Sequence, residues 1–370
     1  MSKITTTHLT KLSRLSRRQS GLVIVAVAII GTAAVVMTRA AGPLAMFEPE
    51  TGSLSGGATT QSVTGASGSG VVKFAAATTP VPTPTPTACA SGEIGTSPNC
   101  YPAPPAPAAS GKSWKVSYSE EFSGTTLDTT KLSPCFDWNY GDCTGTFNQG
   151  RERYMPSQVR LSNGTAKLVA EPLSPPYAST GCYQGSCNYK AGLVSTARPR
   201  ADNGSPYLFP FTYGYVESRM KYPATSGFFT AFWMLPTDTS FSYRSEIDIV
   251  EILGGDPDTI FMTYHYNDRG QSYALNNGDN NNGACAVKDY STDFVRFGVD
   301  WQPTYIAWYI NGVKCGQFNG NSSTIENGPM QIILHMMVDN NWERSWGLTL
   351  PSLDLTRQLE VDYLRIYQQQ

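Results

Sequence analysis

The C-terminal two-thirds of the chain consists of short, strand-length segments separated by turn residues, with almost no helical periodicity. Such spacing predicts an all-β fold, an antiparallel sandwich of two sheets. One hairpin is especially clear, because residues 301–310 and 313–318 flank Asn311-Gly312, a pair that favours a tight primed turn. The other expected strands cover residues 212–222, 228–235, 245–253, 258–266, 294–301 and 358–367.

The start of the chain has the pattern of an export signal. Residues 1–20 are basic, and residues 21–37 form an uncharged, apolar run. This run is as long as the longest signal-peptide cores and as short as the shortest membrane-spanning helices, so a cleaved signal and an uncleaved anchor both remain open. The basic flank predicts that the N-terminus stays inside. We therefore expect an extracellular or cell-surface protein that either is secreted or contacts the membrane through residues 21–37.

Two low-complexity segments follow this signal. Residues 38–79 are rich in Gly, Ser and Thr, which is typical of a spacer. Residues 80–112 form a Pro/Thr-rich linker, in which nine prolines lie between Pro80 and Pro107 and favour an extended polyproline II segment. The folded catalytic domain is accordingly expected to span residues 113–370.

The eight cysteines fit an exported protein, because they form close pairs in sequence without a repeated metal-binding spacing. Eight cysteines allow about 105 connectivities. Proximity favours Cys89 with Cys100, Cys135 with Cys143, Cys182 with Cys187, and Cys285 with Cys315. With three histidines in the whole chain, a histidine-rich metal centre is not expected.

The charge balance argues for an uncharged partner. The formal net charge is −2 and the isoelectric point is near 6.0, so no basic surface is available to attract nucleic acid. We expect a monomer whose partner is a polysaccharide rather than a nucleic acid.

The segment Glu246-Ile-Asp-Ile-Val-Glu251 places three acids inside a run of β-forming residues. In a regular strand Glu246 and Asp248 share one face, whereas Glu251 points to the other. A one-residue β-bulge near Val250 would return Glu251 to the shared face, and bulges recur beside active sites. The competing interpretation, a solvated strand face, is disfavoured by the apolar residues between the acids.

This acidic strand resembles the bulged ExDxxE signature of glycoside hydrolase family 16, and the resemblance extends over residues 113–370. The His335-Met-Met-Val-Asp-Asn-Asn-Trp342 segment departs from the Gly-rich loop common in that family. The other segments that resemble the family are Glu121–Lys131, Tyr213–Arg219, Gly227–Leu235, Phe297–Gly312 and Val361–Tyr367.

The resemblance implies a concanavalin A-like jelly roll with an open cleft on its concave sheet and retaining hydrolysis of a β-linked polysaccharide. It implies that Glu246 is the nucleophile and that Glu251 is the general acid and base. Asp248, between them, would orient Glu246 and disfavour ionisation of Glu251. No cofactor is required for this chemistry.

Five further residues are candidates for substrate binding. Indole rings suit the apolar faces of sugars, which favours Trp233, Trp342 and Trp346, although core packing is the alternative for each. The family places a cleft histidine at the position of His265, which would touch the sugar or Glu251, although a lone histidine is more often structural. Arg219 would contact the nucleophile region or pair with Glu217.

The sequence also suggests a calcium ligand, a class of substrate and two alternative functions. In some relatives the position of Asp362 helps to bind a structural calcium ion, which needs six to eight oxygen ligands. The expected substrate is a laminarin-like β-1,3-glucan or a mixed β-1,3/1,4-glucan, cleaved internally. A transglycosylase using the same residues, and a non-catalytic lectin of the same fold, are the two alternative functions.

Overall fold

The computed structural model describes residues 59–62, 70–73 and 88–370, apart from 140–141, 200–203, 238–244 and 276–281. The chain divides into two compact units, Met1–Thr85 and Pro86–Gln370. In the first unit the described residues form one antiparallel pair, β1 (Thr59–Ser62) with β2 (Gly70–Lys73). The expected export segment at residues 1–37 lies outside the described residues. None of the described helices is long and apolar enough to cross a membrane.

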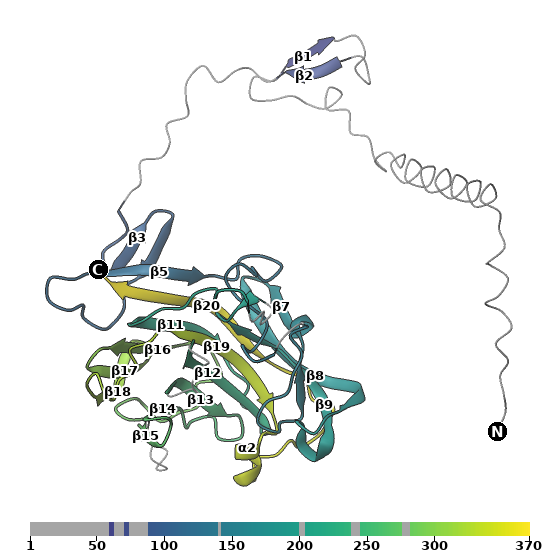
Figure 1. Ribbon diagram of the computed structural model, residues 1–370. Coiled ribbons are helices and arrows are strands. Elements are labelled where there is room, and N and C mark those ends of the chain that lie inside the picture. The colour runs from purple at the N-terminus through teal and green to yellow at the C-terminus, as the bar shows by residue number, and fades with distance from the viewer. Residues whose placement is uncertain are drawn as a thin grey trace, which may run out of the picture. The chain divides into compact units, whose positions relative to one another are not determined.

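The second unit is built from two large β-sheets (Figure 1). The six-stranded sheet has the order β10 (Leu193–Ser195), β19 (Met330–Val338), β12 (Phe228–Pro236), β13 (Glu246–Leu253), β14 (Phe261–Tyr266), β15 (Gln271–Ala274). The ten-stranded sheet contains β18 (Val313–Asn319), β17 (Tyr305–Ile310), β16 (Val295–Gln302), β11 (Gly214–Lys221), β20 (Arg357–Gln369), β8 (Thr165–Ala178), β9 (Ser186–Ala191) and β6 (Glu152–Tyr154), with β5 (Trp114–Glu120) on β20 and β7 (Val159–Ser162) on β8. Apart from the parallel β6–β9 pair, these pairings are antiparallel, which confirms the predicted sandwich.

The predicted strands are confirmed with small shifts at their ends. The expected segment 228–235 is β12, 294–301 is β16 and 358–367 is β20, which runs from Arg357 to Gln369. The predicted hairpin turn is also present, since Asn311 and Gly312 have φ of 50° and 82°. Positive φ at both positions is what a primed turn between twisted strands requires. Local residue preference and tertiary structure therefore agree in this half of the chain.

The core between the sheets contains Trp301 of β16 and Trp308 of β17, which are fully buried. Trp301 Nε1 donates to the carbonyl of Glu326 at 3.0 Å. Trp308 Nε1 donates to the carbonyl of Asp248 at 2.8 Å and thereby joins the ten-stranded sheet to β13. Each indole has a partner for its N–H, which a buried polar group needs.

The folded unit begins earlier than the sequence predicts. Residues 88–112 were expected to belong to the linker, but β3 (Glu93–Thr96) and β4 (Asn99–Pro102) form a hairpin closed by the Cys89–Cys100 disulfide. Beyond it, Ala106 packs with Trp114, Tyr215 and Tyr367 in a separate apolar cluster on the ten-stranded sheet. The prediction was wrong because a Pro-rich segment, which cannot build a core of its own, can still cover an aromatic surface supplied by the sheet.

This packing predicts that the position of an N-terminal truncation matters. A chain starting at Ser113 lacks the Ala106 carbonyl that accepts from Trp114 Nε1 at 2.8 Å, and it uncovers the aromatic cluster. The loss should be about 2–4 kcal/mol of unfolding free energy, or several degrees in Tm at about 2–4 °C per kcal/mol. Thermal denaturation of chains starting at Pro86 and at Ser113 checks this. Equal Tm values would show that residues 86–112 add no stability.

Candidate active site

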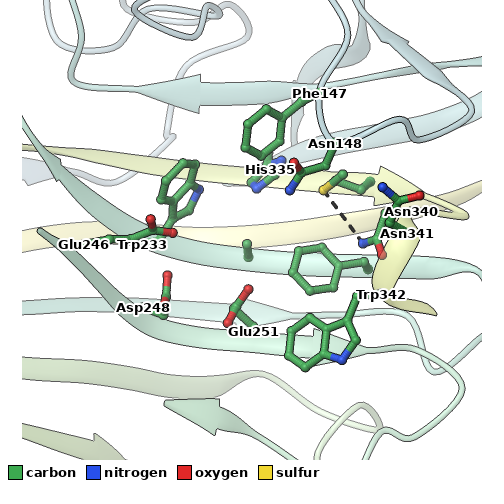
Figure 2. A pocket seen from close by; sticks show the side chains of 13 residues that line it. Phe147, Asn148, Trp233, Glu246, Asp248, Glu251, His335, Asn340, Asn341 and Trp342 are labelled. Atoms are coloured by element: carbon green, nitrogen blue, oxygen red, sulfur yellow. Dashed lines mark hydrogen bonds between the residues drawn. The ribbon is translucent and has the colours of Figure 1, made fainter. Parts of the chain in front are cut away.

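The three acids of β13 are brought to one face by a β-bulge. Toward β12, Val250 pairs with Phe232 while Asp248 pairs with Trp233, which leaves Ile249 as an extra residue on β13. Toward β14 the register also changes between Asp248 and Glu251. The bulge therefore lies where the sequence predicts it. Figure 2 shows its result, because the side chains of Glu246, Asp248 and Glu251 all point into the same cavity.

Two adjoining cavities form a cleft over the six-stranded sheet. The first, of about 220 Å³, is lined by all three acids and by Trp342. The second, of about 580 Å³, is lined by Glu246 but by neither of the other two acids. Four residues line both cavities: Phe147, Asn148, Trp233 and Glu246. Glu246 thus lies at the junction, and a chain-like ligand could extend from it in both directions.

Burial and mutual repulsion raise the pKa of two of the three acids. Burial is the main cause that raises the pKa of Glu251 well above its ordinary value, and the charges of Asp248 and Glu246 raise it further. The pKa of Asp248, which is 2% exposed, is raised by burial, then by the charge of Glu246 and a hydrogen bond to it. Glu251 therefore keeps a proton toward neutral pH, as a general acid must.

Two basic side chains lie beside the acids. His265 Nε2 lies 3.2 Å from Asp248 Oδ2, and the His265 ring is held on its other side by Ser272, whose Oγ is 2.7 Å from Nδ1. Arg269 Nη1 donates to Glu246 Oε2 at 3.2 Å. The structure thus places His265 in the cleft, as expected, but in contact with Asp248.

The expected tryptophans lie at different depths. Trp233 is 4% exposed and lines both cavities, and within the described structure its Nε1 has no hydrogen-bond partner. Trp342 is the second residue of the short helix α2 (Asn341–Ser345) and lines the smaller cavity at its Glu251 end (Figure 2). Trp346 is 48% exposed and packs edge-on against Trp342 and Phe261. Trp346 therefore extends the aromatic surface outside the cavity.

Two sequence candidates are not part of this site. Arg219 lies on β11 and Asp362 on β20, both in the ten-stranded sheet, and their side chains form an ion pair at 2.6 Å. Arg219 pairs neither with Glu246 nor with Glu217, whose carboxylate instead accepts from Tyr215 and Tyr363. Asp362 would have to leave this ion pair to join the shell of oxygens that calcium favours, and the expected calcium site stays a prediction.

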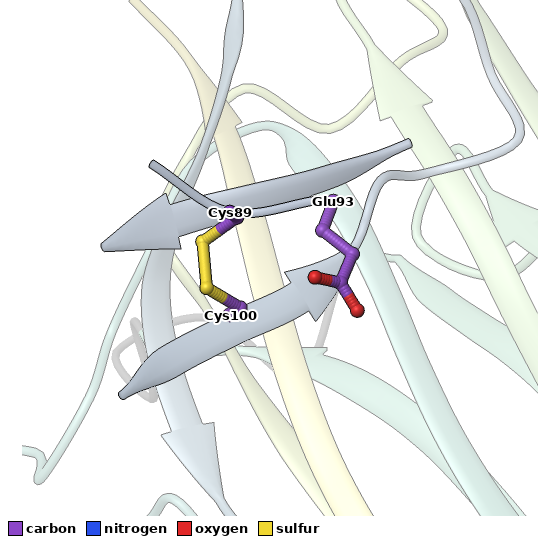
Figure 3. A group of neighbouring side chains, drawn as sticks. All are labelled: Cys89, Glu93 and Cys100. Carbon is purple, nitrogen blue, oxygen red and sulfur yellow. A yellow bond between two sulfur atoms is a disulfide. The ribbon is translucent and has the colours of Figure 1, made fainter. Parts of the chain in front are cut away.

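Metal-ligating side chains come together at one other described position, namely Cys89, Glu93 and Cys100 (Figure 3). The two cysteines are joined in a disulfide and so offer no thiolate. The group is therefore not a metal site. All four disulfides predicted from proximity are present, and the other three join Cys135 to Cys143, Cys182 to Cys187, and Cys285 to Cys315.

Several residues that line the cleft were not singled out from the sequence. Trp138 lies in the loop closed by the Cys135–Cys143 disulfide and Phe147 follows that loop, and both aromatic side chains pack beside Trp233. The signal in the sequence is a pair of nearby cysteines that constrains an irregular segment containing aromatic residues, and this segment lines the cleft. No comparable sequence pattern identifies Arg269, which lies in a tight turn after β14, as a residue of the cleft.

Buried polar residues on β6 support the strand that forms the cleft floor. Tyr154 Oη lies 2.8 Å from Nδ1 of His335, a residue of β19 that lines the smaller cavity. Glu152 Oε2 accepts from the backbone N–H of Val338 at 2.9 Å. Burial lowers the pKa of His335 to about 3, so its ring is neutral. Burial raises the pKa of Glu152 to about 8.

Comparisons with known proteins agree with the fold and the motif. Residues 196–364 match the sequence profile described as "Glycosyl hydrolases family 16". The chain is 25% identical over 275 residues to Glucan endo-1,3-beta-glucosidase A1 of Niallia circulans, a match that covers 68% of this chain and 38% of that enzyme. It is 26% identical over 271 residues to Beta-glucanase of Rhodothermus marinus, covering 69% of this chain and 85% of that enzyme.

Solved structures show the same architecture. The laminarinase from Rhodothermus marinus aligns with a TM-score of 0.55 at 22% identity, covering 70% of this chain and 99% of that structure. Among curated relatives the shared part is often small, since the chain spans 38%, 39% and 44% of three of them. The common element is the β-sheet domain in the C-terminal part of this chain.

The buried Glu152 predicts a pH-dependent stability. Its pKa rises on folding from an ordinary 4.5 to about 8, so its stabilising contribution is fully present below pH 4.5 and is lost as the pH rises through 8. Glu152→Gln removes this ionisation while keeping an oxygen that accepts from Val338. The fall in Tm between pH 5 and 8.5 should be smaller in this variant than in the natural protein or in Glu93→Gln, which alters an exposed acid. Parallel Tm curves would contradict this assignment.

Proposed function

Because this chain belongs to glycosyl hydrolases family 16, we propose that residues 86–370 form a retaining endo-glycosidase that hydrolyses a β-linked glucan. The observation that carries the proposal is the bulge on β13, which directs Glu246, Asp248 and Glu251 into one cavity. A protein surface without a catalytic role would not need three crowded carboxyl groups, since the charge of each group raises the free energy of ionising its neighbour.

The three acids divide the reaction between them. Glu246 attacks the anomeric carbon and forms a glycosyl-enzyme ester, while Glu251 gives its proton to the departing oxygen. Glu251 then removes a proton from water, which attacks the same carbon and returns the electron pair to Glu246. Burial of Glu251 suits the first step, because the raised pKa retains the proton to be donated. Asp248, whose pKa is raised by burial and by the charge of Glu246, lies beside Glu246 in the same cavity and would hold it in place.

The substrate we propose is a neutral β-1,3-glucan or mixed β-1,3/1,4-glucan. Aromatic rings along the cleft offer stacking surfaces for successive sugar rings, with Trp138 in the larger cavity, Trp233 at the junction and Trp342 in the smaller cavity. The printed names of the relatives, an endo-1,3-beta-glucosidase and endo-1,3-1,4-beta-glycanases, point to the same linkages. Cavities on both sides of Glu246 suit cleavage within a chain.

The site of action that we propose is outside the cell. Four disulfides in the described part of the chain favour an oxidising compartment. The apolar run at residues 21–37 would direct export and, if it is retained, would anchor the enzyme at the membrane. Catalysis by the three acids needs no cofactor.

A polysaccharide panel tests the function and separates it from the two alternatives. We expect the chain to release reducing ends from laminarin or a mixed-linkage glucan, with the product linkages identified by methylation analysis. A transglycosylase would instead redistribute chain lengths without a matching increase in reducing ends. A lectin would bind the glucan and release nothing, and either result would refute the proposed hydrolysis.

Variants of the two glutamates should separate their roles. Glu246→Gln and Glu251→Gln should each remove most turnover without unfolding the domain. On an aryl glycoside with a good leaving group, azide should rescue Glu251→Gln and yield a β-glycosyl azide, because a small anion needs no general base. Azide should not rescue Glu246→Gln in this way. Equal rescue of both, with the same product stereochemistry, would refute the assignment.

A further inference from the structure

The turn between β14 and β15 has an unusual backbone. Tyr266 pairs with Gln271, so the connection contains four residues. The first three, Asn267, Asp268 and Arg269, have φ of 51°, 57° and 60°. Left-handed conformations are unfavourable for residues other than glycine, and three in succession indicate that the surrounding structure imposes them.

This turn directs Arg269 back over the sheet toward Glu246. Two side-chain hydrogen bonds stabilise the hairpin, one from Asn267 to Gln271 at 2.6 Å and one between Ser272 and His265 at 2.7 Å. Arg269 Nη1 then lies 3.2 Å from Glu246 Oε2, and its side chain lines the larger cavity. The hairpin therefore holds a cation in contact with the proposed nucleophile.

The charges around this contact are unbalanced without Arg269. Three carboxyl groups line the smaller cavity, and Glu246 belongs to both cavities. Arg269 is the one arginine or lysine among the described residues that line either cavity. The other nearby basic group, His265, lies against Asp248 rather than against Glu246.

We propose that Arg269 is a positioning residue for Glu246, the proposed nucleophile. Its guanidinium stabilises the Glu246 carboxylate most in the step in which Glu246 regains its negative charge. This inference rests on the proposed function. In the first step the bond from the anomeric carbon to Glu246 forms, the glycosidic bond breaks, and the proton of Glu251 goes to the departing oxygen. Glu246 thereby loses its negative charge, and its ion pair with Arg269 weakens.

The second step restores that charge. Water bonds to the anomeric carbon, its proton goes to Glu251, and the carbon–Glu246 bond breaks with its electron pair returning to the carboxylate. A guanidinium beside the departing carboxylate stabilises the charge that develops in this transition state. Arg269 should accordingly accelerate breakdown of the glycosyl-enzyme more than its formation.

If the ion pair between Arg269 and Glu246 has only a structural role, a different result is expected. The Arg269 side chain is 42% exposed, and surface ion pairs contribute little to stability. Losing such a pair would lower the Tm slightly and leave the relative rates of the two steps unchanged. The rate of the second step therefore distinguishes a positioning role from a structural one.

The test uses a dinitrophenyl β-glycoside of the glucan disaccharide that the natural protein hydrolyses, because its good leaving group makes the second step limiting. Arg269→Gln should lower kcat about tenfold, the usual effect of losing a hydrogen bond to a charged group after allowance for exposure. KM should fall as well, and rapid quenching with intact-protein mass spectrometry should show accumulated glycosyl-enzyme. Arg269→Lys should restore part of kcat, and Lys115→Gln, which removes an exposed cation elsewhere, should behave as the natural protein.

Each other outcome is decisive. An unchanged kcat in Arg269→Gln, or a loss without accumulated glycosyl-enzyme, would overturn the positioning role while leaving the proposed function intact. If Arg269→Gln fails to fold, Arg269→Lys decides, since a folded lysine variant should still show slower release of the glycosyl group. A natural protein that hydrolyses no glucan would instead overturn the proposed function and this inference with it.

Discussion

The bulge in β13 is the constraint on which the rest of the site depends. Without the extra residue between Asp248 and Val250, strand alternation would turn Glu251 away from Glu246. With it, three carboxyl groups share one cavity and their mutual repulsion, added to burial, raises the pKa of two of them. The chemistry proposed for this protein thus begins as an irregularity in hydrogen-bond register.

The surrounding structure maintains this crowded arrangement. Trp308 of the opposite sheet donates to the Asp248 carbonyl and fixes β13 from below. From the side of β14 and β15, His265 contacts Asp248 and Arg269 offsets the negative charge of Glu246. Glu152 and Tyr154 support β19 from behind through Val338 and His335. Contacts from both sheets therefore hold the three acids in an environment that would otherwise favour their separation.

Sequence reasoning was accurate where local preference and tertiary structure coincide. The strand pattern and the Asn311-Gly312 turn follow from residue periodicity and turn chemistry, and both are present. The bulge, expected because the three acids of one strand could not otherwise share a face, is present as well. It failed for residues 88–112, because a Pro-rich composition says nothing about packing on a distant aromatic surface. It also placed Arg219 near the nucleophile, although β11 belongs to the other sheet.

By itself, the sequence predicted the fold class, the strand that carries the three acids and the pairing of the cysteines, since these depend mainly on spacing along the chain. Only the tertiary structure decided which side chains surround the acids. Trp138 lies 95 residues before Trp233 in the sequence, yet their rings pack 6.5 Å apart. Arg269 reaches Glu246 because a left-handed turn aims it there. Such contacts follow from how distant segments pack, which no local pattern records.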